Sequence, residues 1–574
     1  MSKRHLLAAC LASAILILAA SAGTYLLAAP GDAKAANARK AKAAKAKAAP
    51  APAAATGAEG EPEEPEGPYK GIAKAFITDI ANGKADLAIK GANDYLAEHP
   101  ADLECPFCLA VAYSTLKQPD KAMEYVKQAV AGGLPIGRFH AGPRDLLATL
   151  TETKAFRDFA AEHPIDLVHG PVLGAMTDTS VRVWVRCATM TPVQVLASTS
   201  ADMSDAVKSD PVCTAAWVDY TAVVEVTGLK PDTVYHYQVL VGGKPAKIDP
   251  APTFRTFPAP GSKSRFQVVF GGGAGYTPQH ERMWDTLLKH RPLAFLAMGD
   301  NVYIDEPNSP ETQRYCYYRR QSRPEYRRFV SATPMFAIWD DHDFGTNDCI
   351  GSPGIDDIPW KIPVWNVFKE NFVNPSYGGG LKQPGVWFDF TIDGVHFIMP
   401  DCRYYRTSPK LPSPTMLGPV QKNWLLERLK ASKASGATFT VLASSVPWSQ
   451  GTKPGSLDTW DGFPQEREEI FSFIKDNRIE GVFLISADRH RSDAYKNDRP
   501  GAYPLYEASS SKLTNVHTHG LIKKALFGYN AKCSFGLLTF DAAAADPELT
   551  YDVYNIDDEK INTLKVKRSE LSFK

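Results

Sequence analysis

The feature that most constrains the fold is a series of short apolar segments ending in side chains that can bind a metal or transfer a proton. The segment Phe336-Ala-Ile-Trp339 runs directly into Asp340, Asp341, His342 and Asp343. Placing so many titratable groups at the end of a buried strand is costly, because burial penalises their charged forms. The cluster therefore predicts metal ligation, acid–base chemistry or both, and the alternative is a solvated turn with an aspartate cap.

Other apolar segments repeat this arrangement. They are of strand length, apolar on both faces, and rich in β-branched and aromatic residues: Leu293–Asp300, Val395–Asp401, Thr438–Ser445 and Gly481–His490. This pattern is typical of central strands in a sheet that is covered on both sides. Because ligands bind beyond the carboxyl ends of the strands in such sheets, we expect the terminal Asp, His and Ser side chains to meet at one edge.

The residue types at these strand ends suit a site with two metal ions. Such sites hold the ions roughly 3.5–4 Å apart, bridged by a carboxylate and by water or hydroxide. His342 is a candidate to protonate the leaving alkoxide of an ester. Arg489, Arg403 and Arg406 each follow a strand end, where a guanidinium is available to neutralise the non-bridging oxygens of a phosphoryl group.

Other interpretations of the strand ends receive less support. Ser444 and Ser445 lack the Gly-x-Ser-x-Gly context of a serine hydrolase nucleophile. The segment Gly271–Gly275 is not followed by the Gly-Lys-Ser/Thr of a nucleotide-binding loop, so we predict a tight turn beside the site. Asp343 is interpreted as a turn cap, and Asp401 as a residue that orients the arginine two positions later.

Composition limits the partners of the chain. Its 574 residues are enough for roughly three or four domains, and its formal net charge is zero. Without an overall basic field, nothing in the composition points to nucleic-acid binding. Lys3, Arg4 and His5 precede an uncharged apolar stretch, residues 6–29, which predicts a signal peptide or membrane anchor in residues 1–29. Both interpretations predict export to the periplasm or cell surface, with membrane association through the N-terminus if the segment is an anchor.

Periodicity divides the rest of the chain into segments. Residues 30–68 are dominated by Ala, Lys, Pro and Glu, which predicts a disordered linker. Residues 69–165 have apolar residues at helical spacing and resemble tetratricopeptide repeats, so we expect a small TPR-like helical domain that can bind a protein partner. Residues 166–258 alternate with a period of two, which predicts a β-sandwich similar to fibronectin type III domains. Strands and helices alternate in residues 264–574, which predicts an α/β catalytic domain.

Several motifs resemble those of the PhoD-like alkaline phosphatases, and the resemblance covers residues 167 to about 555. The matching motifs are Gly299–Tyr303, Trp339–Asp343, Pro400–Arg406 followed by Leu417–Trp424, Ser486–His490 and Tyr503–Ser511. The resemblance implies the αββα sandwich of the metallophosphoesterases, preceded by the β-sandwich. It also implies an exported enzyme that hydrolyses phosphate monoesters or diesters.

The resemblance further implies a set of metal ligands. They are Asp300, Tyr303, Asp341, His342, Asp488 and His490. Asp300 would bridge the two metals, and Tyr303 would bind a ferric ion as a phenolate. Asp341, with His342 beside it, would bind the second metal, which is a calcium ion in the family. Oxygen-rich ligation with a phenolate suits such hard ions.

The sequence departs from the family pattern at Gly273. Family members have a cysteine on the iron at this position, so the ferric site here lacks one ligand. The predicted metal pair is therefore Ca²⁺ with Fe³⁺ or with another transition metal. His280, a few residues on, is a candidate replacement ligand. His517 and His519 have metal-like spacing, for which the alternative is a surface loop near the mouth of the site.

The sequence therefore predicts an exported phosphatase in which a metal-bridging water attacks a phosphate ester, with His342 and Arg489 as catalytic residues. The alternative of a different class is a catalytically degenerate surface scaffold that binds a partner. A third interpretation keeps the metals but assigns another ester as the substrate.

Overall fold

The computed structural model describes residues 69–574. The predicted signal peptide or anchor in residues 1–29 and the predicted linker in residues 30–68 lie outside the described residues. Within the described part, no helix is both long enough and apolar enough to cross a bilayer.

The first described segment is helical, as predicted. Its helices are α2 (Tyr69–Ala81), α3 (Ala85–Glu98), α4 (Glu104–Thr115), α5 (Pro119–Ala131), α6 (Gly137–Ala141), α7 (Arg144–Thr151) and α8 (Lys154–Glu162). Helix α4 is buried along most of its length, because α3, α5 and α7 all contact it. Its apolar residues therefore cover all sides instead of forming one stripe. The likeness of this segment to tetratricopeptide repeats stays a prediction.

The next segment supplies short strands. They are β1 (His169–Gly174), β2 (Ser180–Arg186), β3 (Pro192–Ser198), β4 (Val207–Lys208), β5 (Val212–Cys213), β6 (Thr221–Thr227), β7 (Val234–Val241), β8 (Lys244–Pro245) and β9 (Thr253–Arg255). Strands β3 and β7 form a separate sheet with the short strands, whereas β1, β2 and β6 join a nine-stranded sheet. The junction is a parallel pair between β1 and β12 (Met335–Ile338). The likeness of this segment to fibronectin type III domains stays a prediction.

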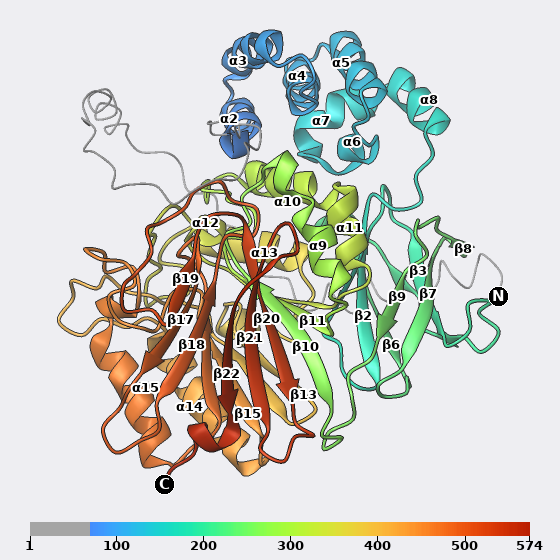
Figure 1. Cartoon of the computed structure of the whole chain (residues 1–574). Coiled ribbons are helices and arrows are strands. Elements are labelled where there is room, and N and C mark those ends of the chain that lie inside the picture. The colour runs from blue at the N-terminus through green and yellow to red at the C-terminus, as the bar shows by residue number, and fades with distance from the viewer. Residues whose placement is uncertain (1–68) are drawn as a thin grey trace, which may run out of the picture. The chain divides into compact units, whose positions relative to one another are not determined.

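Two large sheets form the rest of the molecule (Figure 1). The nine-stranded sheet has the order β22-β21-β20-β10-β11-β12-β1-β2-β6, with β10 (Arg265–Gly271), β11 (Ala294–Met298), β20 (Ser534–Asp541), β21 (Glu548–Asn555) and β22 (Lys560–Lys567). The seven-stranded sheet has the order β13-β14-β15-β16-β18-β17-β19. Its strands are β13 (Phe388–Ile392), β14 (Val395–Met399), β15 (Phe439–Ala443), β16 (Val482–Ser486), β17 (Ser492–Asn497), β18 (Leu505–Ser510) and β19 (Phe527–Tyr529).

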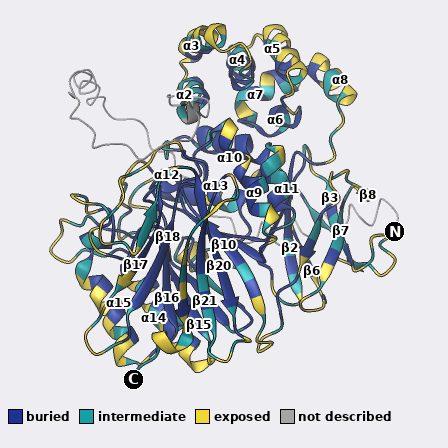
Figure 2. Cartoon of the chain, in the orientation of Figure 1, coloured by how far each residue is buried: buried dark blue, intermediate teal, exposed yellow. Residues whose placement is uncertain are grey.

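The two sheets pack face to face through apolar side chains. Phe540 of β20 lies 5.8 Å from Phe397 of β14 and 5.9 Å from Phe439 of β15, measured between ring centroids. Strands β11, β12, β14, β15 and β16 are buried at every position, as expected for strands covered on both faces. Figure 2 shows this burial as continuous dark strands, with the exposed residues confined largely to helices and loops.

Helices cover the outer faces of both sheets. The helices of this part are α9 (Met283–Lys289), α10 (Pro310–Gln321), α11 (Pro324–Val330), α12 (Asp341–Phe344), α13 (Lys361–Asn371), α14 (Gly418–Ala434) and α15 (Pro464–Asp476). Trp284 of α9 contacts Phe295 of β11, so α9 covers the nine-stranded sheet. Helix α14 packs on β14 and buries Leu425 and Leu429, so it covers the seven-stranded sheet. The resulting order of layers is helix, sheet, sheet, helix.

A buried ion pair ties the N-terminal helices to α10. Glu104 accepts hydrogen bonds from Arg138 at 2.7 and 2.8 Å and from the Tyr315 hydroxyl at 2.6 Å. Burial alone would raise the pKa of Glu104, but the Arg138 guanidinium lowers it below its ordinary value of 4.5. The charged carboxylate is therefore the form that the folded protein stabilises.

We predict that Glu104→Gln lowers the free energy of unfolding by about 3 kcal/mol, because it leaves the buried Arg138 charge without its partner. The folded pKa is depressed, so this stabilisation is present above the unfolded pKa and is lost as pH falls through the folded pKa. Denaturant titrations from pH 7 down to pH 3 measure the difference. The matched control is Asp158→Asn, which breaks the exposed Lys154–Asp158 pair and should cost less than about 0.5 kcal/mol. An equal loss in both variants contradicts the prediction.

Candidate metal centre

The strand ends meet at one edge, as the sequence predicts. Strands β11 and β12 are parallel neighbours with Met298 opposite Ile338, so Asp300 and Asp340 follow their strands by the same two positions. Gly299 separates the strand from Asp300 and has a φ of +103°, and a Cβ there would lie 2.6 Å from the Cβ of Asp340. Only glycine permits so close an approach between the two strand ends.

The backbone at the site is held in an uncommon conformation. Asp300 and Tyr303 have φ values of +54°, Asp488 has +66° and His490 has +47°. Few non-glycine residues adopt this left-handed region, because their side chains then crowd the backbone. Such residues concentrate at functional sites, where the surrounding structure enforces them. Four of the predicted metal ligands therefore share a conformation that stability alone does not favour.

One group of ligand atoms joins the two sheets. The Tyr303 hydroxyl lies 2.9 Å from Asp300 Oδ2 and 2.8 Å from His490 Nε2. His490 Nε2 lies 3.9 Å from Asp300 Oδ2. Asp300 follows β11 and His490 follows β16, so this carboxylate, phenol and imidazole come from opposite sheets. The structure thus brings together three of the predicted ligands.

A second group also contains Asp300. Ligand atoms of Asp300, Asp341 and His342 all lie within 4.8 Å of one another. Oδ1 of Asp300 and Oδ1 of Asp341 are buried and accept no hydrogen bond in the described part of the chain. Buried carboxylate oxygens without a partner are costly, and a cation would satisfy them. The residues present therefore fit a bound metal ion, and the oxygen-rich set suits a hard cation.

The electrostatics of the site also favour a cation. Burial raises the pKa of the Asp341 carboxyl to about 7 and that of Asp343 to about 8. Burial raises the pKa of Asp300 as well, and the charge of Asp488 adds to this effect. The carboxylates therefore repel one another in a poorly solvated space, and a positive ion among them would lower these pKa values.

His342 belongs to a chain of charges that begins in helix α2. Its Nδ1 lies 2.5 Å from Asp305, and the Asp305 carboxylate accepts a 2.9 Å hydrogen bond from Lys74. Lys74 also donates to the main-chain oxygen of Tyr303 at 3.1 Å. Burial alone would lower the pKa of His342, but the carboxylates of Asp300, Asp305 and Asp341 raise it to about 10. These carboxylates therefore favour the protonated form of the imidazole, whose Nδ1 is paired with Asp305.

Arg403 and Arg406, two of the three arginines predicted to bind a phosphoryl group, pair with buried carboxylates. Arg403 is fully buried and pairs with Asp340 at 2.5 Å and with Asp458 at 2.8 Å. Arg406 also pairs with Asp458, at 2.8 Å. The Arg403 guanidinium is thus committed to carboxylates, so the prediction that it is available for a substrate is wrong. Arg406 keeps Nε and Nη1 without a hydrogen-bond partner in the described chain, so for Arg406 the prediction stays open. Arg489 remains a candidate, because its Nε is buried and has no hydrogen-bond partner in the described chain.

Several predicted supporting roles are observed. The Asp343 carboxylate accepts the main-chain N–H groups of Asn301 and Val302, at 2.8 and 3.2 Å, and so caps the loop that carries Asp300. The Asp401 carboxylate accepts the N–H of Arg403 at 2.9 Å, as expected for a residue that orients this loop. The glycine-rich segment does not form the predicted tight turn but runs alongside the site, where Ala274 N–H donates to the Asp300 carbonyl at 2.8 Å.

The residues Asp305, Lys74, Asp458 and Lys453 were not predicted from the sequence. Lys453 pairs with Asp348 at 2.7 Å and with Asp458 at 3.3 Å, close to the acidic cluster. Asp305 lies only five positions after Asp300, which is the one local signal that could have identified it. The other three lie outside the strand ends, in a distant helix or in loops, where no periodic pattern marks them.

Gly273 does not leave room for a side chain. Its φ is +65°, and a Cβ there would lie 2.4 Å from the Ser511 carbonyl oxygen. His280, the candidate replacement ligand, points its Nδ1 to the Thr514 carbonyl at 3.1 Å and to Cys533 Sγ at 3.3 Å. His280 belongs to none of the groups of ligand atoms found among the described residues, so the structure does not bring it to the site as a replacement ligand. The imidazoles that do approach His490 are those of His517 and His519.

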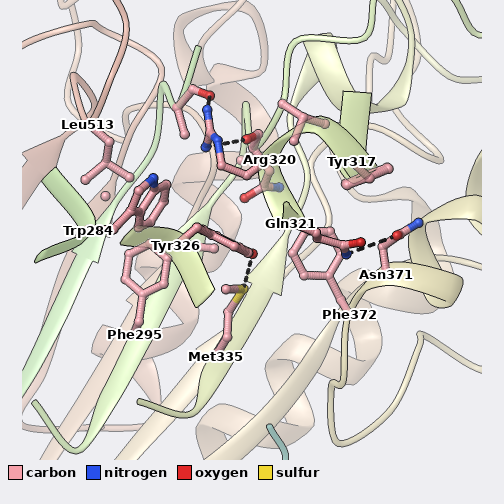
Figure 3. Close-up of a pocket in the computed structure, with 16 residues that line it drawn as sticks. Trp284, Phe295, Tyr317, Arg320, Gln321, Tyr326, Met335, Asn371, Phe372 and Leu513 are labelled. Atoms are coloured by element: carbon pink, nitrogen blue, oxygen red, sulfur yellow. Dashed lines mark hydrogen bonds between the residues drawn. The ribbon is translucent and has the colours of Figure 1, made fainter. Parts of the chain in front are cut away.

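A small pocket, shown in Figure 3, is lined in part by Gly299 and Asn301, the residues on either side of Asp300. It is lined by rings such as Trp284, Phe295 and Tyr326, and Tyr326 contacts the sulfur of Met335 across it. None of the 16 residues that line it has a carboxylate or an imidazole. The pocket therefore holds none of the candidate metal ligands.

Comparison with solved structures shows which proteins share the fold of the α/β part of the chain. A structure titled "Structure of PhoD" aligns with a TM-score of 0.59 and 18% identity, over 70% of this chain and 90% of that one. The structure of purple acid phosphatase PPD1 from yellow lupin (Lupinus luteus) aligns with a TM-score of 0.53 and 11% identity, over 71% of this chain and 76% of that one. The α/β part of the chain thus shares its layered fold with these two phosphatase structures.

Sequence comparison narrows the class. The PhoD-like phosphatase family model matches residues 381–524, and a domain of unknown function (DUF7800) matches residues 165–260. Alkaline phosphatase D of Bacillus subtilis (strain 168) is 25% identical over 342 residues, which is 50% of this chain and 56% of that protein. Purple acid phosphatase 15 of Arabidopsis thaliana is 25% identical over 198 residues, 31% of this chain and 34% of that protein.

The chain spans little more than half the length of the first of these curated relatives and about a third of the second. The predicted resemblance is nevertheless confirmed, because the family model, the Bacillus subtilis relative and the PhoD fold agree. Residues 381–524 therefore match a PhoD-like phosphatase domain, and the chain resembles these phosphatases in sequence and in fold.

We predict that Gly273→Ala lowers the free energy of unfolding by about 1–3 kcal/mol more than Gly228→Ala does, because the new Cβ collides with the Ser511 main chain. Gly228 is the matched control, since its φ of +76° is similar but nothing lies within 4 Å of an added Cβ. Chemical denaturation of both variants measures the difference. Equal losses would show that the segment shifts to admit a side chain.

Proposed function

We propose that the PhoD-like domain is a metal-dependent phosphoesterase that hydrolyses phosphate monoesters or diesters. The observation that carries the proposal is the position of Asp300, which belongs to both candidate ligand groups. Its Oδ2 faces Tyr303 and His490, while its Oδ1 is buried without a hydrogen-bond partner in the described chain. A buried carboxylate between two ligand groups is what a bridged pair of metal ions requires.

The proposed metal pair follows from the ligand types. The carboxylates of Asp300 and Asp341 suit Ca²⁺, and the set of Asp300, Tyr303 and His490 suits Fe³⁺ or another transition metal. The charge of Asp488 raises the pKa of Asp300, so Asp488 lies close to Asp300 and is a further candidate ligand. When bound, such ions polarise a phosphoryl oxygen and make a water a better nucleophile at neutral pH.

The protein's own groups would handle the substrate and the proton. His342 holds a proton at Nε2, because Asp305 occupies Nδ1, and would donate it to the leaving alkoxide. Arg489, held against Asp488 at 3.1 Å, would neutralise a non-bridging phosphoryl oxygen with its remaining N–H groups. Lys74 and Asp305 fix the position of His342, so helix α2 would contribute to the active site.

We also propose that the protein is exported and works in the periplasm or at the cell surface, held to the membrane if residues 6–29 are retained as an anchor. The support is the basic start and the uncharged apolar stretch of residues 6–29. The helical segment from Tyr69 to Glu162 would then be available to bind a protein partner.

We predict that the purified protein hydrolyses an aryl phosphate and that a chelator stops the reaction. Asp300→Asn should lower the rate at least about 100-fold. Removing a residue that merely hydrogen-bonds to a metal ligand costs about 10–100-fold, and removing a ligand itself should cost more. The matched control is Asp498→Asn, at a carboxylate whose side chain is 80% exposed, and its rate should equal that of the wild type. Unchanged turnover in Asp300→Asn would overturn the mechanism, and no turnover in chelator-free, metal-supplied wild type would favour the scaffold interpretation.

A further inference from the structure

A cluster of imidazoles lies beside the Asp300 centre. His490 follows β16, whereas His517 and His519 lie in the loop between β18 and β19. One ring nitrogen of each of the three histidines lies within 4.8 Å of the others. The ring centroids are 5.0 Å apart for His490 and His517, 5.3 Å for His490 and His519, and 4.6 Å for His517 and His519. His490 thus lies together with two histidines that follow it by 27 and 29 positions along the chain.

Hydrogen bonds hold the loop on His490 itself. The N–H of His490 donates to the Ser511 hydroxyl at 2.7 Å, and the carbonyl of His490 accepts from the Thr518 hydroxyl at 3.1 Å. Thr518 lies between the two loop histidines, so this bond fixes both of them relative to the third. Asn530 reinforces the arrangement by donating to the His519 carbonyl at 2.9 Å.

Contacts on two sides also hold the ring of His490 in position. On one side, His490 contacts the Tyr303 hydroxyl, which in turn contacts Asp300. On the other side, Gly273 brings its backbone close to the ring of His490, since a Cβ there would lie 3.5 Å from His490 Cδ2. His517 is exposed and His519 is half-buried, so the cluster opens to solvent, from which an ion can enter.

We infer that His490, His517 and His519 bind one divalent transition-metal cation of the Zn²⁺ type. Three imidazole nitrogens are a ligand set that occurs in zinc sites, and the Tyr303 hydroxyl and Asp300 Oδ2 lie 2.8 and 3.9 Å from His490 Nε2 as further ligands of the same ion. Imidazole nitrogen suits zinc, copper, iron and nickel, whereas calcium prefers oxygen. The carboxylates of Asp300 and Asp341 and the imidazole cluster would therefore select different cations. The inference deepens the proposed function, because it assigns two ligands to the transition-metal side of the same centre.

The test measures metal binding on the full chain, independently of turnover. Protein stripped with a chelator is dialysed against Zn²⁺ alone or Ca²⁺ alone, and the bound metal is counted by mass spectrometry. We expect the His517→Ala/His519→Ala double variant to bind Zn²⁺ at least about 100-fold more weakly than the wild type. Its Ca²⁺ uptake should be unchanged. The matched control is His99→Ala, at an exposed histidine of the N-terminal helices, which should leave both uptakes unchanged.

Cobalt substitution provides a second measurement. Co²⁺ bound to the wild type should give visible absorption bands that shift or weaken in the double variant, and His517→Gln/His519→Gln should behave likewise while keeping polar side chains in the loop. Wild-type Zn²⁺ affinity and an unchanged Co²⁺ spectrum in the double variants would overturn the inference. The two proposals fail separately, since a protein that binds Zn²⁺ through these histidines but hydrolyses no phosphate ester would refute only the proposed function.

Discussion

The structure depends on the cost of burying several carboxylates at the same edge of two facing sheets. Asp300, Asp340, Asp341 and Asp343 are all nearly inaccessible to water. Buried carboxylates repel one another and lose hydration, so each must be given a partner. The Asp340 carboxylate accepts hydrogen bonds from Arg403 and from the Ser445 hydroxyl, and the Asp343 carboxylate accepts them from main-chain N–H groups. Asp300, Asp340 and Asp341 each keep an oxygen that accepts no hydrogen bond in the described chain. Arg403 lies 3.7 Å from that oxygen of Asp341, and bound cations would neutralise the charge that remains.

The surrounding fold is arranged so that these groups cannot move apart. The parallel pair of β11 and β12 sets Asp300 beside Asp340, and the facing sheet brings His490 to the same point. Left-handed backbone at Asp300 and His490 costs stability locally, and the buried sheets supply the stability that maintains it. The N-terminal helices also take part, since Lys74 and Glu104 reach Asp305 and Tyr315. Residues of the N-terminal helices therefore help to position the site, together with those of the α/β domain.

The sequence predicts those features that are written into local patterns. The apolar segments identify the central strands, which are found as β11, β12, β14, β15 and β16. Helix α10 was not predicted, because its buried face is built from Tyr315, Arg319 and Arg320 instead of aliphatic residues. Polar residues of this kind are stable in a core only through partners that come from elsewhere in the chain.

The residues of the site likewise divide into those that a local sequence pattern marks and those that only a distant partner positions. Asp300, Asp341 and His490 could be predicted because each ends a strand. Lys74 could not, since its partner Asp305 lies 231 positions away and no local pattern connects them. The role of Arg403 was assigned wrongly for the same reason, because Asp458 comes from a loop with no periodicity.

The central claim is that the carboxylate of Asp300 is shared by two cations. A crystal structure of the metal-loaded protein, with anomalous diffraction collected at the absorption edges of the bound metals, tests it most directly. The account predicts two anomalous peaks about 3.5–4 Å apart, with an oxygen of Asp300 in the coordination sphere of each. Peaks that leave Asp300 outside both coordination spheres, or a single peak at full occupancy, would contradict it.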